Sequence, residues 1–359
     1  MEYNKYFSEN YYQARNKFRK LSLKNNLRLE SKKIIDDLTI DFAFLENNEK
    51  EKLLILVSGT HGVEGFTGSA VQLFFLEKIL PELKDNISVA LIHSLNPYGM
   101  KYLRRYNHNN IDLNRNYINN FKNIDLDKKT IEDIKKLRHL MSPQRPAKAY
   151  FTEQVLHYYY IFKTIIKIGT SRLIRATSKG QNIYPNTVAY CGVKKEEETK
   201  YLEAIVKSIT KGYKEVIFID LHTGTAKRNT LNIYTRNKEY KRKFKKINKN
   251  TYLKDTKTKR GMDYIGGNDK LFLENSKAEK NVELTLEFGP FSRINSLFSI
   301  EHTSFLITYE NMITFFGPKK KLKKARLKLK EVFSPNRRDY KKFVIKKSNF
   351  FFKKLFKYF

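Results

Sequence analysis

Four residues of the chain have side chains that bind metals or transfer protons, and each stands in a distinctive string. His61 and Glu64 are three positions apart in the string HGVEGFTGS, His222 ends the string DLH, and Glu287 opens the string EFGP. A catalytic zinc site typically takes three His or Glu ligands and keeps a fourth position for water. His61, Glu64 and His222 fit that ligand set. Glu287 is then a carboxylate suited to act as general base toward the water.

Each of these strings follows a short apolar run that predicts a buried strand. The runs are 53–57, 216–219 and 282–286. Apolar-rich runs of this length are typical of buried strands. Open α/β sheets bind ligands at the carboxyl ends of their strands, so residues far apart in sequence can converge there. We therefore expect the four side chains to meet at one edge of the sheet.

The pair formed by His61 and Glu64 is a weak signal on its own, because His and Glu fall three positions apart by chance in many chains. As ordinary structural residues, His61 would be a turn residue after a strand. Glu64 would be an acid in the first turn of a helix, where the helix dipole favours a negative charge. The strings that lie between the candidate ligands favour a metal site instead.

Between the two candidate histidines the chain contains NPYG at 96–99 and LRRYNHNNIDLNRNY at 103–117. Here it resembles the zinc carboxypeptidase superfamily, in which an NPDG-type turn precedes arginines and a DLNRNF-type box. It is most similar to a bacterial branch of that superfamily, the domain of unknown function 2817 family. The resemblance extends from about residue 53 to about residue 312, and later matching strings are IYPNTVAYCG at 183–192, DLHTG at 220–224 and LEFGP at 286–290.

The resemblance implies one bound zinc ion per chain, with His61, Glu64 and His222 as ligands and Glu287 as the catalytic carboxylate. It also implies a zinc carboxypeptidase-like, phosphorylase/hydrolase-like α/β fold: a mixed, mostly parallel twisted sheet with helices on both faces. The alternation of apolar runs with helical patterns along the chain favours the same fold class.

The roles expected for residues of the arginine-rich string come from the resemblance alone. Arg105 matches the arginine that polarises the scissile carbonyl and stabilises the oxyanion, and the adjacent Arg104 competes with it for this role. Asn114 and Arg115 match the pair that grips a substrate carboxylate, a task for which the planar guanidinium is well suited. As ordinary structural residues these two would form a surface turn with an ion pair. Asp112 would hold an arginine or a histidine in place.

These features together predict a zinc-dependent hydrolase that cleaves an amide bond next to a carboxylate, through metal-activated water. A peptide and an N-acyl amino acid both fit as substrate, so peptidase and deacylase activities remain open. The alternatives are a noncatalytic binding protein on the same fold and a basic protein associated with membranes or nucleic acid. The complete set of ligands and base favours the enzyme. Tyr264, in GMDYIGG, is more simply a structural tyrosine than a substrate contact.

The 359 residues are expected to form one enzyme domain over 1–318, with a helical insertion at about 120–180 and a C-terminal tail at 319–359. Further expected elements are an N-terminal helix through about Lys24, strands at 38–45 and 89–95, helices at 70–79 and 195–211, and a loop region at 225–281.

The formal net charge of +34 is not explained by the enzyme prediction. The tail at 319–359 holds 17 Lys and Arg residues against two acids and interleaves them with aromatic residues. A basic segment of this kind is suited to an anionic membrane surface. The same charge can bind nucleic acid nonspecifically, although no specific nucleic-acid motif is present. A codon bias toward Lys and Asn accounts for the charge without any partner.

The expected location is the cytoplasm, with peripheral membrane contact through the tail. Cys191 is the only cysteine, so no disulfide framework is predicted. The N-terminal string lacks the apolar segment of a signal peptide, and no apolar stretch of about 18 residues reads as a transmembrane helix.

Overall fold

The computed structural model describes residues 2–83, 86–141, 143–224, 226–253, 265–290 and 296–357. Tyr264 and the last two aromatic residues of the chain, Tyr358 and Phe359, lie outside these ranges. All of the candidate site residues lie inside them.

Within the described part of the chain, eight strands form one mixed sheet. Their order across the sheet is β1 (Arg28–Ile35), β2 (Leu38–Leu45), β4 (Ile87–His93), β3 (Lys52–Ser58), β5 (Glu215–Thr223), β8 (Lys280–Phe288), β6 (Leu231–Thr235) and β7 (Thr251–Leu253). The four central strands β4, β3, β5 and β8 are parallel. Antiparallel pairs add β2 and β1 on one side and β6 on the other, and β7 pairs in parallel with β6. The predicted α/β fold with a mixed, mostly parallel sheet is confirmed.

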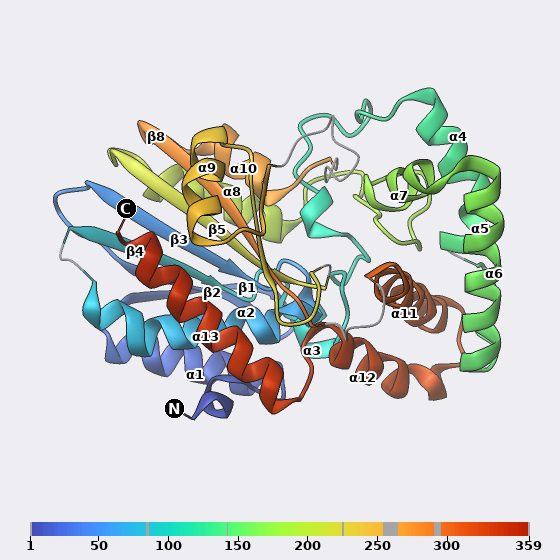
Figure 1. The fold of residues 1–359 in the computed structure, drawn as a ribbon, viewed down its shortest axis with the longest axis horizontal. Helices are drawn as coiled ribbons and strands as arrows, with labels where there is room; N and C mark the ends of the chain where they lie inside the picture. The colour runs from blue at the N-terminus through green and yellow to red at the C-terminus, as the bar shows by residue number, and fades with distance from the viewer. Residues whose placement is uncertain are drawn as a thin grey trace.

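Helices cover both faces of the sheet (Figure 1). On one face lie α1 (Tyr11–Lys24), α2 (Gly65–Phe74), α9 (Lys238–Ile247) and α13 (Arg338–Leu355). On the other face lie α8 (Glu197–Ile209) and α10 (Asn268–Asn275). Side chains alternate along β5, so that Ile217 and Ile219 pack in the first layer while Val216 and Phe218 pack in the second. Burial on both faces explains why β3 and β5 contain unbroken apolar runs.

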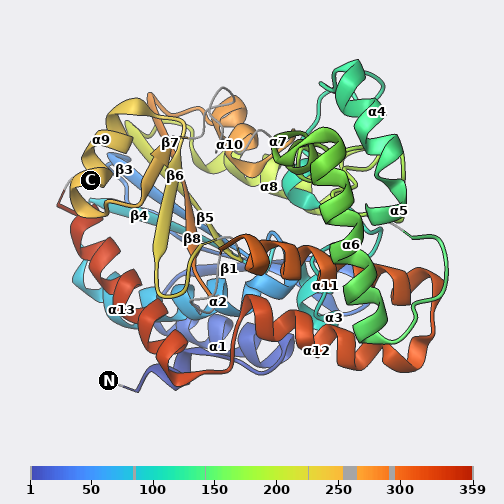
Figure 2. The same ribbon diagram turned by 45° about the vertical axis from the view of Figure 1, so that its right-hand side comes forward.

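A group of helices stands beside the sheet, near the carboxyl ends of its central strands (Figures 1 and 2). Its members are α3 (Pro97–Tyr102), α4 (Lys128–Lys136), α5 (Arg138–Met141), α6 (Tyr150–Ile168), α7 (Thr170–Ser178), α11 (Ser296–Phe316) and α12 (Leu322–Phe333). The segment at about 120–180, expected to be a helical insertion, contains α4 to α7. Two apolar clusters hold most of the group together, one centred on α11 and α12 and the other on α4, α6 and α7, while α3 packs through Met100 against α1 and α2.

Two predictions of secondary structure from the sequence differ from the structure. The helix expected at 70–79 begins earlier, at Gly65, and its last part, Phe75–Ile79, is a π-helical turn. The segment 225–281, expected to be loop, contributes β6, β7, α9 and α10. Lysines dominate this segment, so its composition predicted a loop. The apolar residues Tyr240 and Phe244 nevertheless pack α9 on the sheet.

The described residues of the segment 319–359 form a short 3-10 turn and two helices. Its helices α12 and α13 pack on the rest of the chain, and Phe351, Phe352 and Leu355 of α13 are buried in the main core. The ring of Phe352 lies 5.0 Å from that of Phe75 on the π-helical turn. Most aromatic side chains of the segment therefore contact the core rather than solvent. No helix in the described ranges is long and apolar enough to span a bilayer.

Candidate metal centre and catalytic cavity

A tight turn after β3 presents the first two candidate ligands. His61 precedes the short 3-10 helix Gly62–Glu64, which leads directly into α2. A Cβ atom on Gly62 would lie 2.1 Å from the backbone of Gly99, so only glycine lets the two segments approach this closely. The amides of Gly62 and Val63 donate hydrogen bonds to the carbonyls of Arg105 and Arg104, at 3.1 and 2.8 Å. The ligand turn and the arginine string are thereby fixed to each other.

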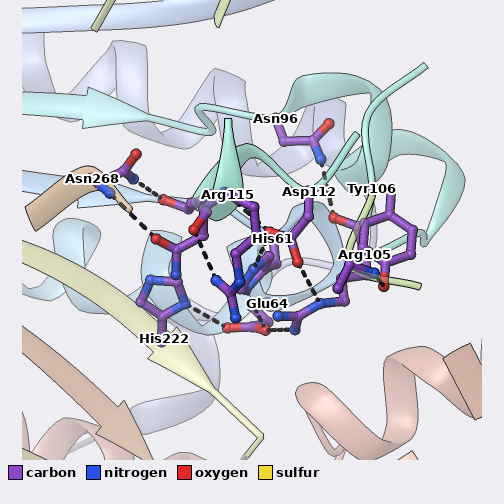
Figure 3. Close-up of polar contacts among 12 residues, drawn as sticks. His61, Glu64, Asn96, Arg105, Tyr106, Asp112, Arg115, His222 and Asn268 are labelled. Carbon is purple, nitrogen blue, oxygen red and sulfur yellow. Dashed lines mark hydrogen bonds and ion pairs between the residues drawn. The ribbon is translucent and has the colours of Figure 1, made fainter. Parts of the chain in front are cut away.

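The structure brings His61, Glu64 and His222 together, with one potential ligand atom from each within 4.8 Å of the others (Figure 3). All three side chains are buried. Nδ1 of His61 lies 2.8 Å from Oε1 of Glu64 without hydrogen-bond geometry and has no other partner among the described residues. Nδ1 of His222 lies 3.1 Å from Oε2 of Glu64. Donor atoms that face one point in this way, two imidazoles and a carboxylate, suit a zinc ion.

The far side of each imidazole contacts an aspartate. Nε2 of His61 is hydrogen-bonded to Oδ1 of Asp112 at 3.1 Å, and Nε2 of His222 lies 2.9 Å from Oδ2 of Asp220. Such carboxylate contacts fix the ring orientation and keep the proton on Nε2, which leaves Nδ1 available to a metal. Asp112 thus contacts His61, and it also lies 3.6 Å from Nε of Arg105.

Asp220 is itself held by two residues that the sequence analysis did not select. Its Oδ1 accepts a hydrogen bond from Oγ1 of Thr60 at 2.9 Å, and its Oδ2 accepts one from Nδ2 of Asn268 at 3.0 Å. The backbone amide of Asn268 also donates to Oδ1 of Asn114 at 3.3 Å. Asn268, the first residue of α10, thus links the His222 support to the predicted carboxylate grip (Figure 3).

The charges of the cluster are strongly coupled. Burial opposes ionisation of Glu64, but His61 and His222 outweigh burial and hold the pKa of Glu64 well below its ordinary value. Burial likewise disfavours a charged His222, yet Asp220 and Glu64 raise the pKa of His222 well above 6.5. The metal-free chain thus gathers anionic oxygens around a protonated imidazole. A divalent cation supplies the same positive charge, and its binding releases that proton.

Glu287 reaches the cluster from the neighbouring strand. It is the register partner of His222 in the parallel pair of β5 and β8, and register partners project from the same face of a sheet. Asp220 and His222 continue the row that begins with Val216 and Phe218, so the row changes from apolar to polar at the carboxyl end of β5. Glu287 is buried and lines the same cavity as the three candidate ligands.

Arg105 lies beside the cluster with part of its side chain open to the cavity. Its Nη1 donates to Oε1 of Glu64 at 2.9 Å, and its Nε lies 3.6 Å from Oδ2 of Asp112. Burial would lower the pKa of Arg105, but Asp112 and Glu64 raise it above its ordinary value, so the guanidinium keeps its charge. The side chain is 18% exposed, which makes it accessible to a molecule in the cavity.

Arg104 points away from the cavity, so it is not placed to compete with Arg105 for contact with a substrate, as the sequence had allowed. Its side chain is only 2% exposed and its Nε donates to both carboxylate oxygens of Glu310 on α11, at 2.9 and 3.2 Å. Its Nη2 donates to the side-chain oxygens of Asn110 and Asn311. With these acceptors occupying the guanidinium, Arg104 ties α11 to the turn that carries Arg105.

Asn114 and Arg115 both line the cavity. The guanidinium of Arg115 is oriented by two main-chain carbonyls: Nε donates to Ser178 and Nη1 donates to Asn114, both at 2.8 Å. A Cβ atom on Gly266 would lie 2.3 Å from the carbonyl oxygen of Arg115, so glycine is needed where that segment crosses the string. The alternative of an exposed surface turn does not apply, because both side chains are at least nine-tenths buried.

The cavity has a volume of about 250 Å³ and joins the metal-ligand cluster to the helical group. Its polar side consists of the cluster, Glu287, Arg105, Asn114 and Arg115. Its opposite side is mostly apolar, with Ile161 from α6, Leu173 and Ile174 from α7, Ile307 from α11, Val188, and Phe333 from α12. Thr303 and Ser304 of α11 add hydroxyl-bearing residues to this wall.

The supporting roles of Asp220, Thr60 and Asn268 were not predicted from the sequence. The residues of the apolar wall were not predicted either. Asp220 had a usable signal, because it precedes His222 by two positions on a strand and therefore projects from the same face. Thr60 and Asn268 had none. They are common polar residues whose partner is far away in the sequence.

The chain matches the family model described as protein of unknown function (DUF2817) over residues 7–347. No curated protein matches it. Among solved structures it is similar to carboxypeptidase A from Helicoverpa armigera, with 11% identity, a TM-score of 0.45 and coverage of 90% of this chain and 73% of that one. It is also similar to bovine thrombin-activatable fibrinolysis inhibitor in complex with tick carboxypeptidase inhibitor, with 12% identity, a TM-score of 0.46 and coverage of 86% and 96%.

A third similar structure is the metallo-carboxypeptidase from Burkholderia cenocepacia, with 11% identity, a TM-score of 0.41 and coverage of 86% of this chain and 70% of that one. Likenesses this distant transfer no activity, which has to come from the side chains of the site. The family model, by contrast, spans nearly the whole chain and includes α12 and most of α13. The chain therefore belongs to the DUF2817 family.

Proposed function

We propose that this protein is a zinc-dependent hydrolase that cleaves an amide bond next to a carboxylate. One observation carries the proposal: the buried cluster of His61, Glu64 and His222 shares a single cavity with Glu287 and with two arginines. Each part of an amide hydrolysis has a matching group in that cavity. A structural role for the cluster alone would not account for the arginines beside it.

A zinc ion bound by His61, Glu64 and His222 would act as a Lewis acid toward the carbonyl and lower the pKa of a coordinated water to about 7. The three side chains supply the donors for it, and Asp112 and Asp220 fix both imidazoles from behind.

Glu287 serves as the general base. Its position opposite His222 on the neighbouring strand supports this role, because the carboxylate shares the face and the cavity of the ligand cluster. It accepts a proton from the attacking water and donates that proton to the leaving nitrogen. A positioned acid–base group of this kind contributes about 10²–10⁴-fold to the rate.

Arg105 stabilises the oxygen of the scissile carbonyl as negative charge develops on it. Its charge is secured by Asp112 and Glu64 and its side chain is open to the cavity, so it needs little reorganisation during the reaction. Asn114 and Arg115 bind the substrate carboxylate. The fixed guanidinium plane of Arg115 supports this role, since a planar fork matches the geometry of a carboxylate.

Peptidase and N-acyl-amino-acid deacylase activities use the same groups. Both substrates present an amide bond with a carboxylate on the neighbouring carbon. A noncatalytic binding protein on this fold is less well supported, because a site released from catalysis has no need to keep ligands, base and oxyanion group together.

The test is a turnover assay of zinc-loaded protein on a panel of dipeptides and N-acyl amino acids. Each substrate is paired with a control in which the carboxylate is converted to a primary amide. We expect hydrolysis of at least one free acid and a loss of at least about tenfold in kcat/KM for its amide. Equal turnover of acid and amide would remove the carboxylate from the proposal. No turnover of any member would favour the noncatalytic alternative.

A further inference from the structure

Helix α6 exposes a continuous apolar face to solvent. Five large apolar residues on it have unusually high exposed fractions: Phe151 74%, Val155 50%, Tyr159 55%, Phe162 66% and Ile166 71%. Single exposed apolar residues are common on protein surfaces, but a contiguous group usually marks an interaction site. In Figure 1 α6 stands at the edge of the molecule, and in Figure 2 it lies toward the viewer, with no helix in front of it.

The spacing of these residues places them on one side of the helix. They follow one another at intervals of four, four, three and four positions. With 3.6 residues per turn, such intervals keep the side chains within a sector of about 80°. The buried residues Glu153, His157, Ile161 and Thr164 occupy the opposite side. The helix therefore has an inner face that packs on the protein and a separate outer apolar face.

Basic residues border the outer face. Lys163 and Lys167 are exposed on α6 itself, next to the apolar sector. The start of α6 lies beside the basic segment that leads into α12: Nζ of Lys321 donates to the carbonyls of Ala147 and Lys148 at 3.1 and 2.8 Å. Exposed lysines such as Lys163 and Lys167 can reach lipid headgroups while the apolar side chains enter the bilayer.

The positive charge of the protein favours an anionic partner for this face. A second copy of the chain would bring another net charge of +34 against the same face, which opposes self-association. An anionic lipid surface is complementary to both parts of the surface, since its headgroups attract the lysines and its acyl region accepts the apolar side chains. No described helix can span a bilayer, so α6 would lie in the plane of the interface.

We propose that the outer face of α6 (Phe151, Val155, Tyr159, Phe162 and Ile166), with Lys163 and Lys167 beside it, docks the protein on an anionic membrane surface. This places membrane contact on α6 rather than on the aromatic residues of 319–359, most of which are buried. Docking also orients the catalytic cavity. Ile161 on the inner face of α6 lines that cavity, as does Ile174 of α7, which is itself 50% exposed. The helix that would dock on the membrane therefore also forms part of the cavity wall.

The experiment measures sedimentation of full-length protein with vesicles of phosphatidylcholine containing phosphatidylglycerol, and with pure phosphatidylcholine vesicles as a comparison. The test variant is Phe151→Ser/Phe162→Ser/Ile166→Ser. The matched control is Leu23→Ser/Val193→Ser/Phe350→Ser, which removes three exposed apolar side chains from other elements. We expect the wild type and the control to bind anionic vesicles and the α6 variant to bind at least about tenfold more weakly.

A charge variant, Lys163→Glu/Lys167→Glu, should also bind anionic vesicles more weakly while leaving the apolar residues in place. Turnover of a small substrate in solution reports on folding and should be unchanged in every variant. Binding of the α6 variant equal to that of the control would overturn the proposal, as would failure of the wild type to bind anionic vesicles. A dimer in analytical ultracentrifugation that the α6 variant abolishes would instead assign the face to a second copy.

Discussion

The side-chain amide of Asn268 donates a hydrogen bond to Oδ2 of Asp220 at 3.0 Å, and the same oxygen lies 2.9 Å from Nε2 of His222. Through this contact α10 controls the orientation of a candidate metal ligand on β5. The same residue donates its backbone amide to Asn114. The candidate metal centre and the proposed carboxylate-binding pair therefore share one support.

Zinc affinity should fall in two steps when this support and then the ligand are removed. Asn268→Ala should weaken zinc binding about 10–100-fold, because Asp220 loses a partner and His222 its fixed orientation. His222→Ala should abolish stoichiometric zinc, because only two protein ligands remain. Both are measured by competition with a chromophoric chelator, with Lys270→Ala on the same helix as control. Full zinc occupancy in His222→Ala would show that the ligand set is wrong.

Substitutions of the two adjacent arginines should have different effects, one mainly on stability and the other mainly on catalysis. Arg104→Met leaves Glu310 buried without one of its cations, a change that typically costs about 3–5 kcal/mol. Arg326 also contacts Glu310 at 3.0 Å and should reduce that cost. We expect a lower midpoint in urea unfolding, with zinc-loaded protein that still turns over substrate when folded.

Arg105→Met should show the opposite pattern, a large loss of kcat with a smaller loss of stability. It removes the group that faces the developing oxyanion, so kcat should fall at least about 100-fold while the unfolding midpoint changes less than in Arg104→Met. The two variants are compared in the same zinc-loaded buffer. Equal losses of kcat in both, with equal stability, would mean that the two side chains do not have distinct roles.

Glu198 on α8 should make stability depend on pH. Burial, together with Glu196, raises the pKa of Glu198 from 4.5 to about 7, and its Oε2 is buried with no hydrogen-bond partner among the described residues. Between these two pKa values the folded state binds more protons than the unfolded state. The contribution of protonated Glu198 to stability is therefore present at low pH and is lost as pH rises toward 7.

The variant Glu198→Gln stays neutral at every pH and should remove this dependence. At pH 8 it should be more stable than the wild type by about 2–3 kcal/mol, and the difference should disappear near pH 4.5. Urea unfolding at several pH values measures it. Glu197→Gln, the exposed neighbour, is the control and should change little. A wild-type advantage at pH 8 would mean that Glu198 is ionised and stabilised there.

The central sheet could be predicted from sequence because strands buried on both faces are rich in apolar residues, although Glu283 and Thr285 interrupt the last of the three runs. The runs at 53–57, 216–219 and 282–286 became β3, β5 and β8, and the polar residue that ends each run marks where the strand reaches the cavity. Convergence at one edge then follows from parallel pairing. The side chains of His61, Glu64, His222 and Glu287 meet as that topology requires.

The remaining features depend on partners that the sequence does not specify. Arg104 and Arg105 are neighbours of the same type, and only the backbone path after Leu103, which has a φ of +55°, sends one to Glu310 and the other to the cavity. On α6 both sides carry apolar residues, so periodicity alone cannot tell which side faces the core. In α13 the mixture of lysine and phenylalanine fits a membrane surface as well as it fits the core that the phenylalanines occupy.

The most direct test of the account is the hydrolysis rate of Glu287→Gln on the best substrate of the panel, measured with zinc occupancy equal to that of the wild type. Glutamine has nearly the same shape as glutamate but cannot accept the proton of the attacking water. The account predicts full zinc binding with kcat reduced by about 10²–10⁴-fold. Turnover within a few-fold of the wild type at equal zinc occupancy would contradict it.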